Sequence, residues 1–147
     1  MARPFRFSLQ RVLDYREQLE EQARLALAKA QHAYTAQSEQ VKVLRQALAE
    51  HEGSLYAKGA PTAEELWLWR AYKQRLSQDL GQAEARLLDL AKKLNACRRE
   101  AVERSKERKL LEKLKQNQAE RHAQEEQYRE QKEYDEMATL RYQPRSF

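Results

Sequence analysis

Few side chains in this sequence have the type and spacing that catalysis requires. His122 comes three and four residues before Glu125 and Glu126, so a helix would place a base and an acid on one face. An active site, however, needs several groups that converge in a concave, partly dry pocket. Cys97 is the one cysteine and the three histidines are scattered, which indicates neither a disulfide nor a metal site. We therefore expect a protein that is not an enzyme and that binds no cofactor.

A second candidate chemistry is phosphate binding by the basic run KKLNACRREAVERSKERKLLEKLK, residues 92–115. Four glutamates interrupt this run, so ion pairs between residues four apart on a solvated helix explain its charge equally well. Aromatic side chains, on which bases could stack, are missing from it. Binding to nucleic acid is kept as an alternative, and the favoured expectation is no nucleic-acid partner.

The elements that carry these residues can be read from composition. Charged residues make up 35% of the chain, and its 28 basic and 23 acidic side chains leave a net charge of +5. Such a composition is typical of coiled coils. The residues that break helices are confined, with one exception at Gly81, to the ends and to one short stretch: Pro4, Gly53, Gly59, Pro61 and Pro144. This pattern predicts one domain, 1–147, with a helix over 5–57, a turn at 58–61 and a helix over 62–142.

Both predicted helices repeat apolar residues at alternating spacings of three and four, which is a heptad seam, the line of side chains that faces a partner helix. In the first helix the seam is Leu9, Val12, Arg16, Leu19, Ala23, Ala26, Ala30, Ala33, Gln37, Gln40, Leu44, Ala47 and His51, with a supporting stripe of Leu13, Leu27, Val41, Leu48 and Leu55. In the second it is Leu66, Trp69, Lys73, Leu76, Leu80, Ala83, Leu87, Leu90, Leu94, Cys97, Ala101, Arg104, Arg108 and Leu111. The predicted fold is all-α: a long antiparallel two-helix coiled-coil hairpin whose second helix is the longer.

The start of the second helix has its own signals. Thr62 is suited to cap the helix, and Glu65 follows three residues later, as in a capping box. Trp67 and Trp69 are two residues apart and cannot share one helix face, so we expect one of them to be exposed. A small aromatic cluster that closes the turn and a docking surface for a partner are equally good interpretations.

The second helix outruns the first. After Leu114 the sequence stays rich in helix formers, but its apolar residues become sparse. An isolated helix with so thin an apolar stripe is marginal in water. We therefore expect residues 115–147 to be unpaired within the chain and to pack against another protein.

Antiparallel pairing brings the two ends of the chain together, and both carry recognisable motifs. The opening residues Phe5, Phe7, Leu9, Val12, Leu13 and Arg16 match the pattern F-x-F-x-L-x-x-V-L-x-x-R, and the closing residues Gln131, Lys132, Glu133, Asp135 and Glu136 match Q-K-E-x-D-E. On these motifs, and in length and layout over the whole chain, the sequence resembles the flagellar export protein family FliJ.

The resemblance implies an antiparallel coiled coil of the bacterial flagellar type III export apparatus, similar in shape to the stalk subunit of rotary ATPases. In that family the end with both termini inserts into the hexameric ring of the export ATPase FliI and promotes its assembly. The protein also connects the ring to the export gate protein FlhA and binds export chaperones. The implied location is cytoplasmic, at the inner face of the membrane. No apolar run approaches the ~18 to 20 residues that span a bilayer, so we expect no direct membrane insertion.

Two sets of partner-binding residues follow from the resemblance. The ring-facing candidates are Leu9, Val12, Tyr15, Arg16, Tyr134, Asp135, Met137, Leu140 and Arg141, although seam packing is the favoured role of Leu9 and Val12. The gate-facing candidates, in the weakly paired middle of the hairpin, are Gln40, Leu44, Ala47, His51, Leu76, Leu80, Ala83 and Leu87. Ala47 and His51 stand where other members of the family carry larger, often aromatic, residues. The rival interpretations are the stalk of a virulence type III secretion ATPase and a coiled-coil scaffold without an ATPase partner.

Overall fold

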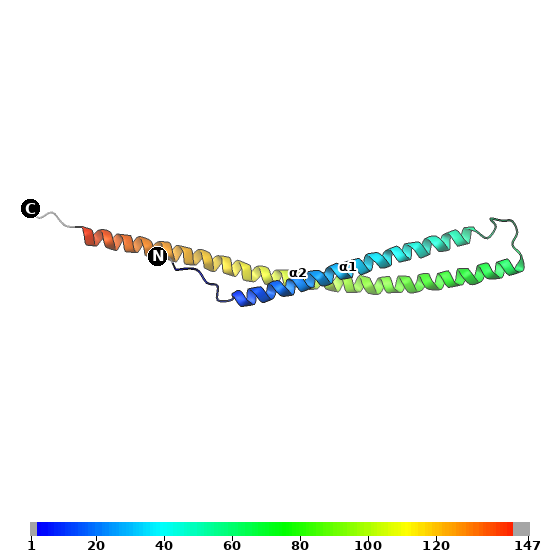
Figure 1. Cartoon of the computed structure of the whole chain (residues 1–147), viewed down its shortest axis with the longest axis horizontal. Helices are drawn as coiled ribbons and strands as arrows, with labels where there is room; N and C mark the ends of the chain where they lie inside the picture. The colour runs from blue at the N-terminus through cyan, green and yellow to red at the C-terminus, as the bar shows by residue number, and fades with distance from the viewer. Residues whose placement is uncertain (1–2, 143–147) are drawn as a thin grey trace, which may run out of the picture. The chain divides into compact units, whose positions relative to one another are not determined.

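The computed structural model describes residues 3–142, which form two helices and no strand. Helix α1 spans Gln10–Gly53 and helix α2 spans Ala63–Arg141, with 44 and 79 residues (Figure 1). The expected all-α hairpin with a longer second helix is confirmed. None of the helices within the described residues is long and apolar enough to cross a membrane. The chain divides into two compact units: Glu21–Val102, and the paired segments Met1–Glu20 and Glu103–Phe147.

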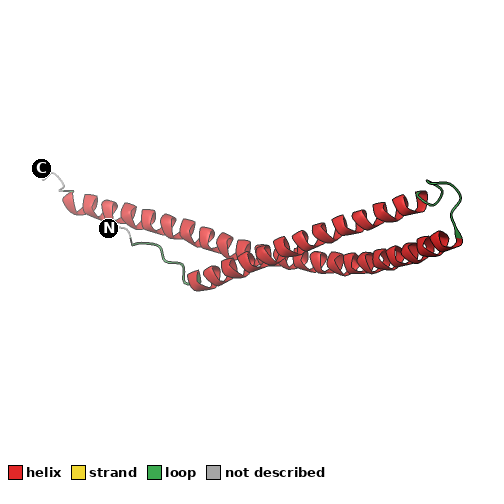
Figure 2. Ribbon diagram, turned by 45° about the vertical axis from the view of Figure 1, so that its right-hand side comes forward, coloured by secondary structure: helices red, strands yellow, loops and turns green. Residues whose placement is uncertain are grey.

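Within the unit Glu21–Val102, the contacts establish antiparallel packing. His51 bonds to Trp69, Arg45 to Glu84 and Gln31 to Arg98, so residues earlier in α1 meet residues later in α2 (Figure 2). The buried side chains are small on α1 and mostly large on α2, and they are Ala23, Ala30, Val41, Leu76, Ala83 and Leu94. Alanines let the helices approach closely, and the opposing leucines fill the space.

The predicted α2 seam agrees with the burial pattern, whereas the predicted α1 seam is wrong at four positions, Leu9, Val12, Ala26 and Gln40, which are exposed. Arg16, Ala23, Ala30, Gln37, Leu44 and His51 are at least half-buried as expected. At Val12, Ala26 and Gln40 the next residue takes the interface; Leu13, for example, is 3% exposed, whereas Val12 is 41% exposed. The line one residue further on is buried or half-buried throughout: Leu13, Glu20, Leu27, Tyr34, Val41, Leu48 and Leu55. Leu19, Ala33 and Ala47 are half-buried beside it, as predicted. Leu27 and Val41 therefore occupy the interface in place of Ala26 and Gln40, which face solvent.

Both ends of α1 differ from the predicted bounds. Residues 3–7 are not helical, and Gln10 donates its amide to the Phe7 carbonyl at 3.1 Å where α1 begins. Helix α1 ends at Gly53 rather than 57, and the Ser54 hydroxyl donates to the His51 carbonyl at 2.7 Å. The chain then turns through Gly59, whose φ of +99° favours glycine.

The predicted capping box at the start of α2 is confirmed. The Glu65 amide donates to the Thr62 hydroxyl at 3.2 Å, and the Thr62 amide donates to the Glu65 carboxylate at 3.3 Å. Together these bonds satisfy backbone donors that the first turn of the helix leaves free. The longer helix thus has a fixed starting point at Ala63.

In the unit formed by the two terminal segments, charged side chains take seam positions. Glu20 is buried and pairs with Arg108, which also bonds to Glu112 at 2.6 Å. One heptad position earlier, Arg16 pairs with Glu107 at 2.7 Å. The apolar seam is therefore interrupted by a polar layer, which we define as Arg16, Glu20, Glu107, Arg108 and Glu112.

The expectation that residues 115–147 have no internal partner is wrong for its first part. The N-terminal segment reaches α2, where Phe5 packs on His122 with ring centroids 5.7 Å apart. His122 Nε2 also bonds to the Arg3 carbonyl at 2.8 Å. Lys115, Ala119, His122 and Glu126 are half-buried, whereas every residue from 127 to 142 is exposed. Residues 143–147 lie outside the described residues.

Candidate partner-binding surfaces

The most exposed apolar surface of the described residues is formed by the last part of α2 and Tyr142, residues 127–142, which we name the open tail. Leu140 is 84% exposed, and its large apolar neighbours on the open tail are Tyr128, Tyr134, Met137 and Tyr142. Tyr134, Met137 and Leu140 follow one another at intervals of three, so they lie on one side of the helix. Contiguous exposed apolar side chains of this kind mark binding surfaces. The C-terminal ring-facing candidates Tyr134, Asp135, Met137, Leu140 and Arg141 all belong to the open tail.

The N-terminal ring-facing candidates have a different environment. Leu9, Val12 and Tyr15 are exposed, because Leu13 takes the buried position in this turn of α1. Arg16 is held by Glu107 in the polar layer and is half-buried. Seam packing, the role favoured for Leu9 and Val12 from the sequence, is therefore not what the structure gives them.

The structure does not bring the two groups of ring-facing candidates together. The N-terminal segment reaches α2 at His122. With a rise of ~1.5 Å per residue, Tyr134 is about 18 Å beyond that point along the helix. Leu9 and Val12 follow Arg3 in the chain and lead back from this point into α1. A partner that contacts both groups must extend along the helices.

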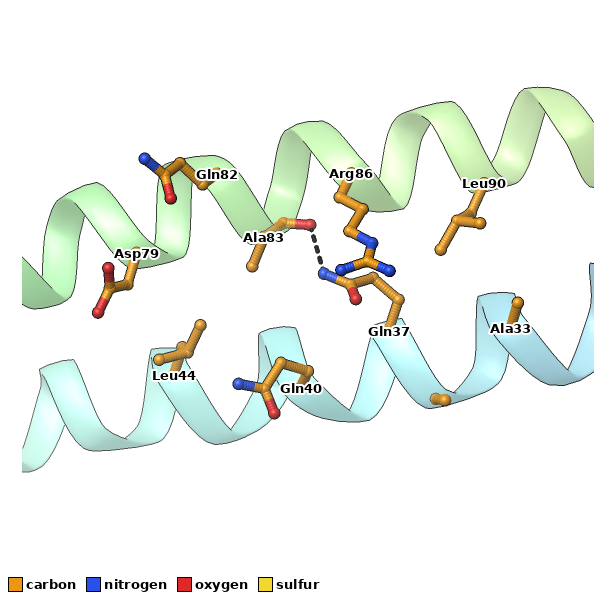
Figure 3. Close-up of a pocket in the computed structure, with 10 residues that line it drawn as sticks. Ala33, Gln37, Gln40, Leu44, Asp79, Gln82, Ala83, Arg86 and Leu90 are labelled. Carbon is orange, nitrogen blue, oxygen red and sulfur yellow. Dashed lines mark hydrogen bonds between the residues drawn. The ribbon is translucent and has the colours of Figure 1, made fainter.

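The middle of the hairpin contains a groove of about 710 Å³ between α1 and α2 (Figure 3). Three gate-facing candidates line it: Gln40, Leu44 and Ala83. The Gln37 side chain reaches across and donates to the Ala83 carbonyl at 3.0 Å. The groove exists because Ala33 and Ala36 are too small to fill the space beside the opposing helix.

The remaining gate-facing candidates lie outside the lining of the groove. Leu76 is buried, and Ala47, Leu80 and Leu87 are half-buried in the helix interface. The groove also contains charged and polar residues that the sequence reasoning missed, namely Asp79, Gln82 and Arg86 on α2. Only the distance between the helices, which the sequence does not reveal, identifies these three as lining residues.

His51, another gate-facing candidate, is held in an aromatic clamp at the turn end of the hairpin. Its ring stacks on Trp69 with centroids 5.1 Å apart and meets the edge of Tyr72 at 4.7 Å. His51 Nε2 bonds to the Trp69 carbonyl, and Trp69 Nε1 donates to the His51 carbonyl, each at 2.8 Å. Two residues earlier, Trp67 is 69% exposed, so the expectation that one tryptophan faces solvent is confirmed.

Two ionisable side chains of the terminal unit, His122 and Arg108, form hydrogen bonds in the structure. His122 bonds to Arg3, while Glu125 is exposed and lies on a shallow surface with Tyr128 and Arg129. Hydrogen bonds from Arg108 to Glu20 and to Glu112 raise the pKa of Arg108 above its ordinary value. Within residues 3–142, no three His, Cys, Asp or Glu side chains are grouped as a metal site requires.

Comparison with protein-family models decides the family, because the model described as Flagellar FliJ protein matches residues 5–146. The chain belongs to the FliJ family. It is therefore a flagellar protein connected with type III export, in a family whose members are non-catalytic export components. Searches among curated proteins and among solved structures find no match to the chain.

Proposed function

We propose that this FliJ-family chain is a non-catalytic stalk and adaptor of the flagellar export apparatus. In this proposal the end of the hairpin that carries the open tail inserts into the hexameric export ATPase and promotes assembly of its ring. The observation that carries the proposal is the exposure of every residue from 127 to 142, including five large apolar side chains. Such a helix is marginal in water without further packing, and a surrounding ring would supply it.

The proposed mechanism is coupling through contacts and not chemistry. A helical end inside a ring touches some subunits more than others, and it shifts their populations only where it binds one nucleotide state more tightly. The open tail has the side chains for such contacts: Tyr134, Met137 and Leu140 as apolar anchors, with Asp135 and Arg141 as charged neighbours. Aromatic and large apolar anchors usually dominate the energy of an interface.

The other partners of the proposal are the export gate protein, export chaperones and, through the gate, the inner face of the cell membrane. We propose the groove lined by Gln40, Leu44 and Ala83 as the gate-binding site. It is open and polar at its rim, as a reversible protein contact requires, since non-obligate interfaces have polar rims. The location that follows is cytoplasmic and peripheral to the membrane.

The ring proposal is tested with purified flagellar export ATPase, by measuring its binding to the chain and its ATP hydrolysis. The double variant Met137→Glu/Leu140→Glu should weaken binding by about 2 kcal/mol, roughly thirtyfold in Kd, because two apolar contacts are lost. Leu88→Glu is the matched control, since Leu88 is an exposed leucine of α2 far from the open tail in sequence. Equal binding by the double variant and this control contradicts the ring proposal.

The gate proposal has a separate test. Ala36→Trp fills the groove without disturbing a buried side chain, because Ala36 lines the groove and is exposed. Binding to the cytoplasmic part of the export gate protein should fall about tenfold. Binding to the ATPase should stay unchanged. Unchanged gate binding by Ala36→Trp eliminates the groove as the gate site and leaves the ring proposal standing.

A further inference from the structure

Residues 3–9 precede α1 without forming a helix and run beside α2 in the terminal unit (Figures 1 and 2). We name this segment the strap. Its sequence permits a helix from residue 5, and Pro4 suits the first turn of one. The non-helical conformation of the strap therefore depends on its contacts with α2 and not on its local sequence.

The strap is attached to α2 by the Phe5 ring and the Arg3 carbonyl, and its Phe7 side chain is buried. Phe7 is 7% exposed, and the Phe5 ring lies against His122 with centroids 5.7 Å apart. His122 Nε2 donates to the Arg3 carbonyl at 2.8 Å. Arg3, Pro4, Arg6, Ser8 and Leu9 are exposed. Ordering an extended segment costs conformational entropy at every residue, so attachment at so few points is easily reversed.

The strap contacts α2 at His122, and His122 lies on a line of half-buried residues that continues the α2 seam. Leu111, Lys115, Ala119, His122 and Glu126 follow at spacings of four, four, three and four, and all are half-buried. Elsewhere in α2 the same line of positions packs against α1, but α1 begins only at Gln10. The covered stretch therefore lies between the part of the seam that α1 occupies and the open tail.

We propose that the strap is a removable cover over residues 115–126 of α2, and that it must leave this surface before the export ATPase can bind there. This inference rests on the proposed stalk function, and it names the ATPase as the occupant that replaces the strap. The spacing of the covered stripe suits a helix-like partner surface, because it continues the interface that α1 forms with α2. The stripe also adjoins the open tail, so removal of the strap gives the ATPase one continuous surface.

Electrostatic attraction is a second contribution to closure of the strap. Arg3 and Arg6 are exposed on the strap, and residues 120–136 of α2 carry an excess of acidic side chains. Attraction between exposed charges is screened by salt. Closure of the strap should therefore be weaker at high ionic strength. A larger fraction of the chains should then leave residues 115–126 open to the ATPase.

The test locks the strap shut. Phe5→Cys and His122→Cys are combined in a chain whose native cysteine is replaced by Cys97→Ala, and the pair is joined by oxidation or by a short bifunctional thiol reagent. The controls are each single-cysteine chain treated in the same way, and the joined chain after reduction. A second chain, Phe7→Ala, loosens the strap by removing its buried anchor. Binding to purified export ATPase is measured for all of them.

We expect the locked chain to bind the ATPase at least about tenfold more weakly than its reduced form, and Phe7→Ala to bind more tightly than the parent, because apparent affinity scales with the open fraction. If the reduced and locked chains bind equally well, the strap is not a cover, although the stalk proposal stands. If no chain binds, including Phe7→Ala, the stalk proposal fails and the strap proposal fails with it. Failure of the two cysteines to join contradicts the closed strap itself.

Discussion

The polar layer offers a quantitative prediction, because it places a buried carboxylate where a coiled coil normally carries an apolar side chain. The Glu20 side chain is 5% exposed and pairs with Arg108, whose side chain is 19% exposed. We consider two changes: Glu20→Ala, which removes one partner, and Glu20→Leu/Arg108→Leu, which replaces the pair by apolar side chains.

The two changes are expected to alter the free energy of unfolding by different amounts and in different directions. Removing one partner of a buried ion pair usually costs about 3 to 5 kcal/mol, because the other charge is left uncompensated. Here Arg108 keeps Glu112 at 2.6 Å, which lowers the expected loss for Glu20→Ala to about 2 kcal/mol. The leucine pair removes both desolvated charges, so we expect it to match the parent or to exceed it by about 1 to 2 kcal/mol.

The assay is equilibrium urea unfolding followed by far-UV circular dichroism, with the free energy of unfolding extrapolated to water. Glu39→Ala is the matched control, since Glu39 also forms an ion pair, with Lys42 at 3.3 Å, but both side chains are largely exposed. Its cost should stay below about 0.5 kcal/mol. The reasoning is refuted if Glu20→Ala costs no more than this control, or if the leucine pair is less stable than Glu20→Ala alone.

Three further predictions concern stability. Gly81→Ala should raise the free energy of unfolding by about 0.5 to 1 kcal/mol, because Gly81 lies inside α2 and a Cβ there meets no atom within 4 Å; a lower melting temperature would contradict this. His51→Ala should lower the free energy of unfolding by about 1 to 2 kcal/mol and shift the fluorescence of Trp69, because the hydrogen bonds between the two residues are lost. Trp67→Phe should leave stability unchanged, because Trp67 is exposed, and equal effects of the two variants would disprove the clamp. A chain that ends at Glu126 should melt within a few degrees of the full chain, since residues 127–142 are exposed, and a large drop in the melting temperature would show that they pack within the chain.

The main features of the fold could be predicted because the residues that break and cap helices are confined to a few places in the sequence. Thr62 and Glu65 fix the start of α2 through bonds between residues three apart, so these two residues suffice to predict the capping box. The α2 seam is equally readable because leucine recurs along it. The α1 seam is ambiguous, since Val12 and Leu13 are adjacent and both apolar. Which of the two is buried depends on the opposing helix, and the buried Glu20 disguises the correct register.

Features that depend on long-range contacts could not be predicted in this way. The strap has helix-permissive residues, and the burial of Phe7 and the bond from His122 to Arg3 decide its conformation. For the same reason residues 115–126 looked unpaired in the sequence. The groove is another case, because Arg86 and Asp79 become lining residues only once the small Ala33 and Ala36 set the local space between the helices. The open tail, by contrast, was predictable from its sparse apolar residues.

The central claim is that the open tail engages a hexameric export ATPase. The most direct measurement is the rate of ATP hydrolysis by purified flagellar export ATPase, titrated with the full chain and with the chain that ends at Glu126. We expect the full chain to raise the rate in a saturable manner and the shortened chain to lose that effect while it keeps its helical circular dichroism signal. Equal stimulation by the two chains, or none by the full chain, would contradict the account.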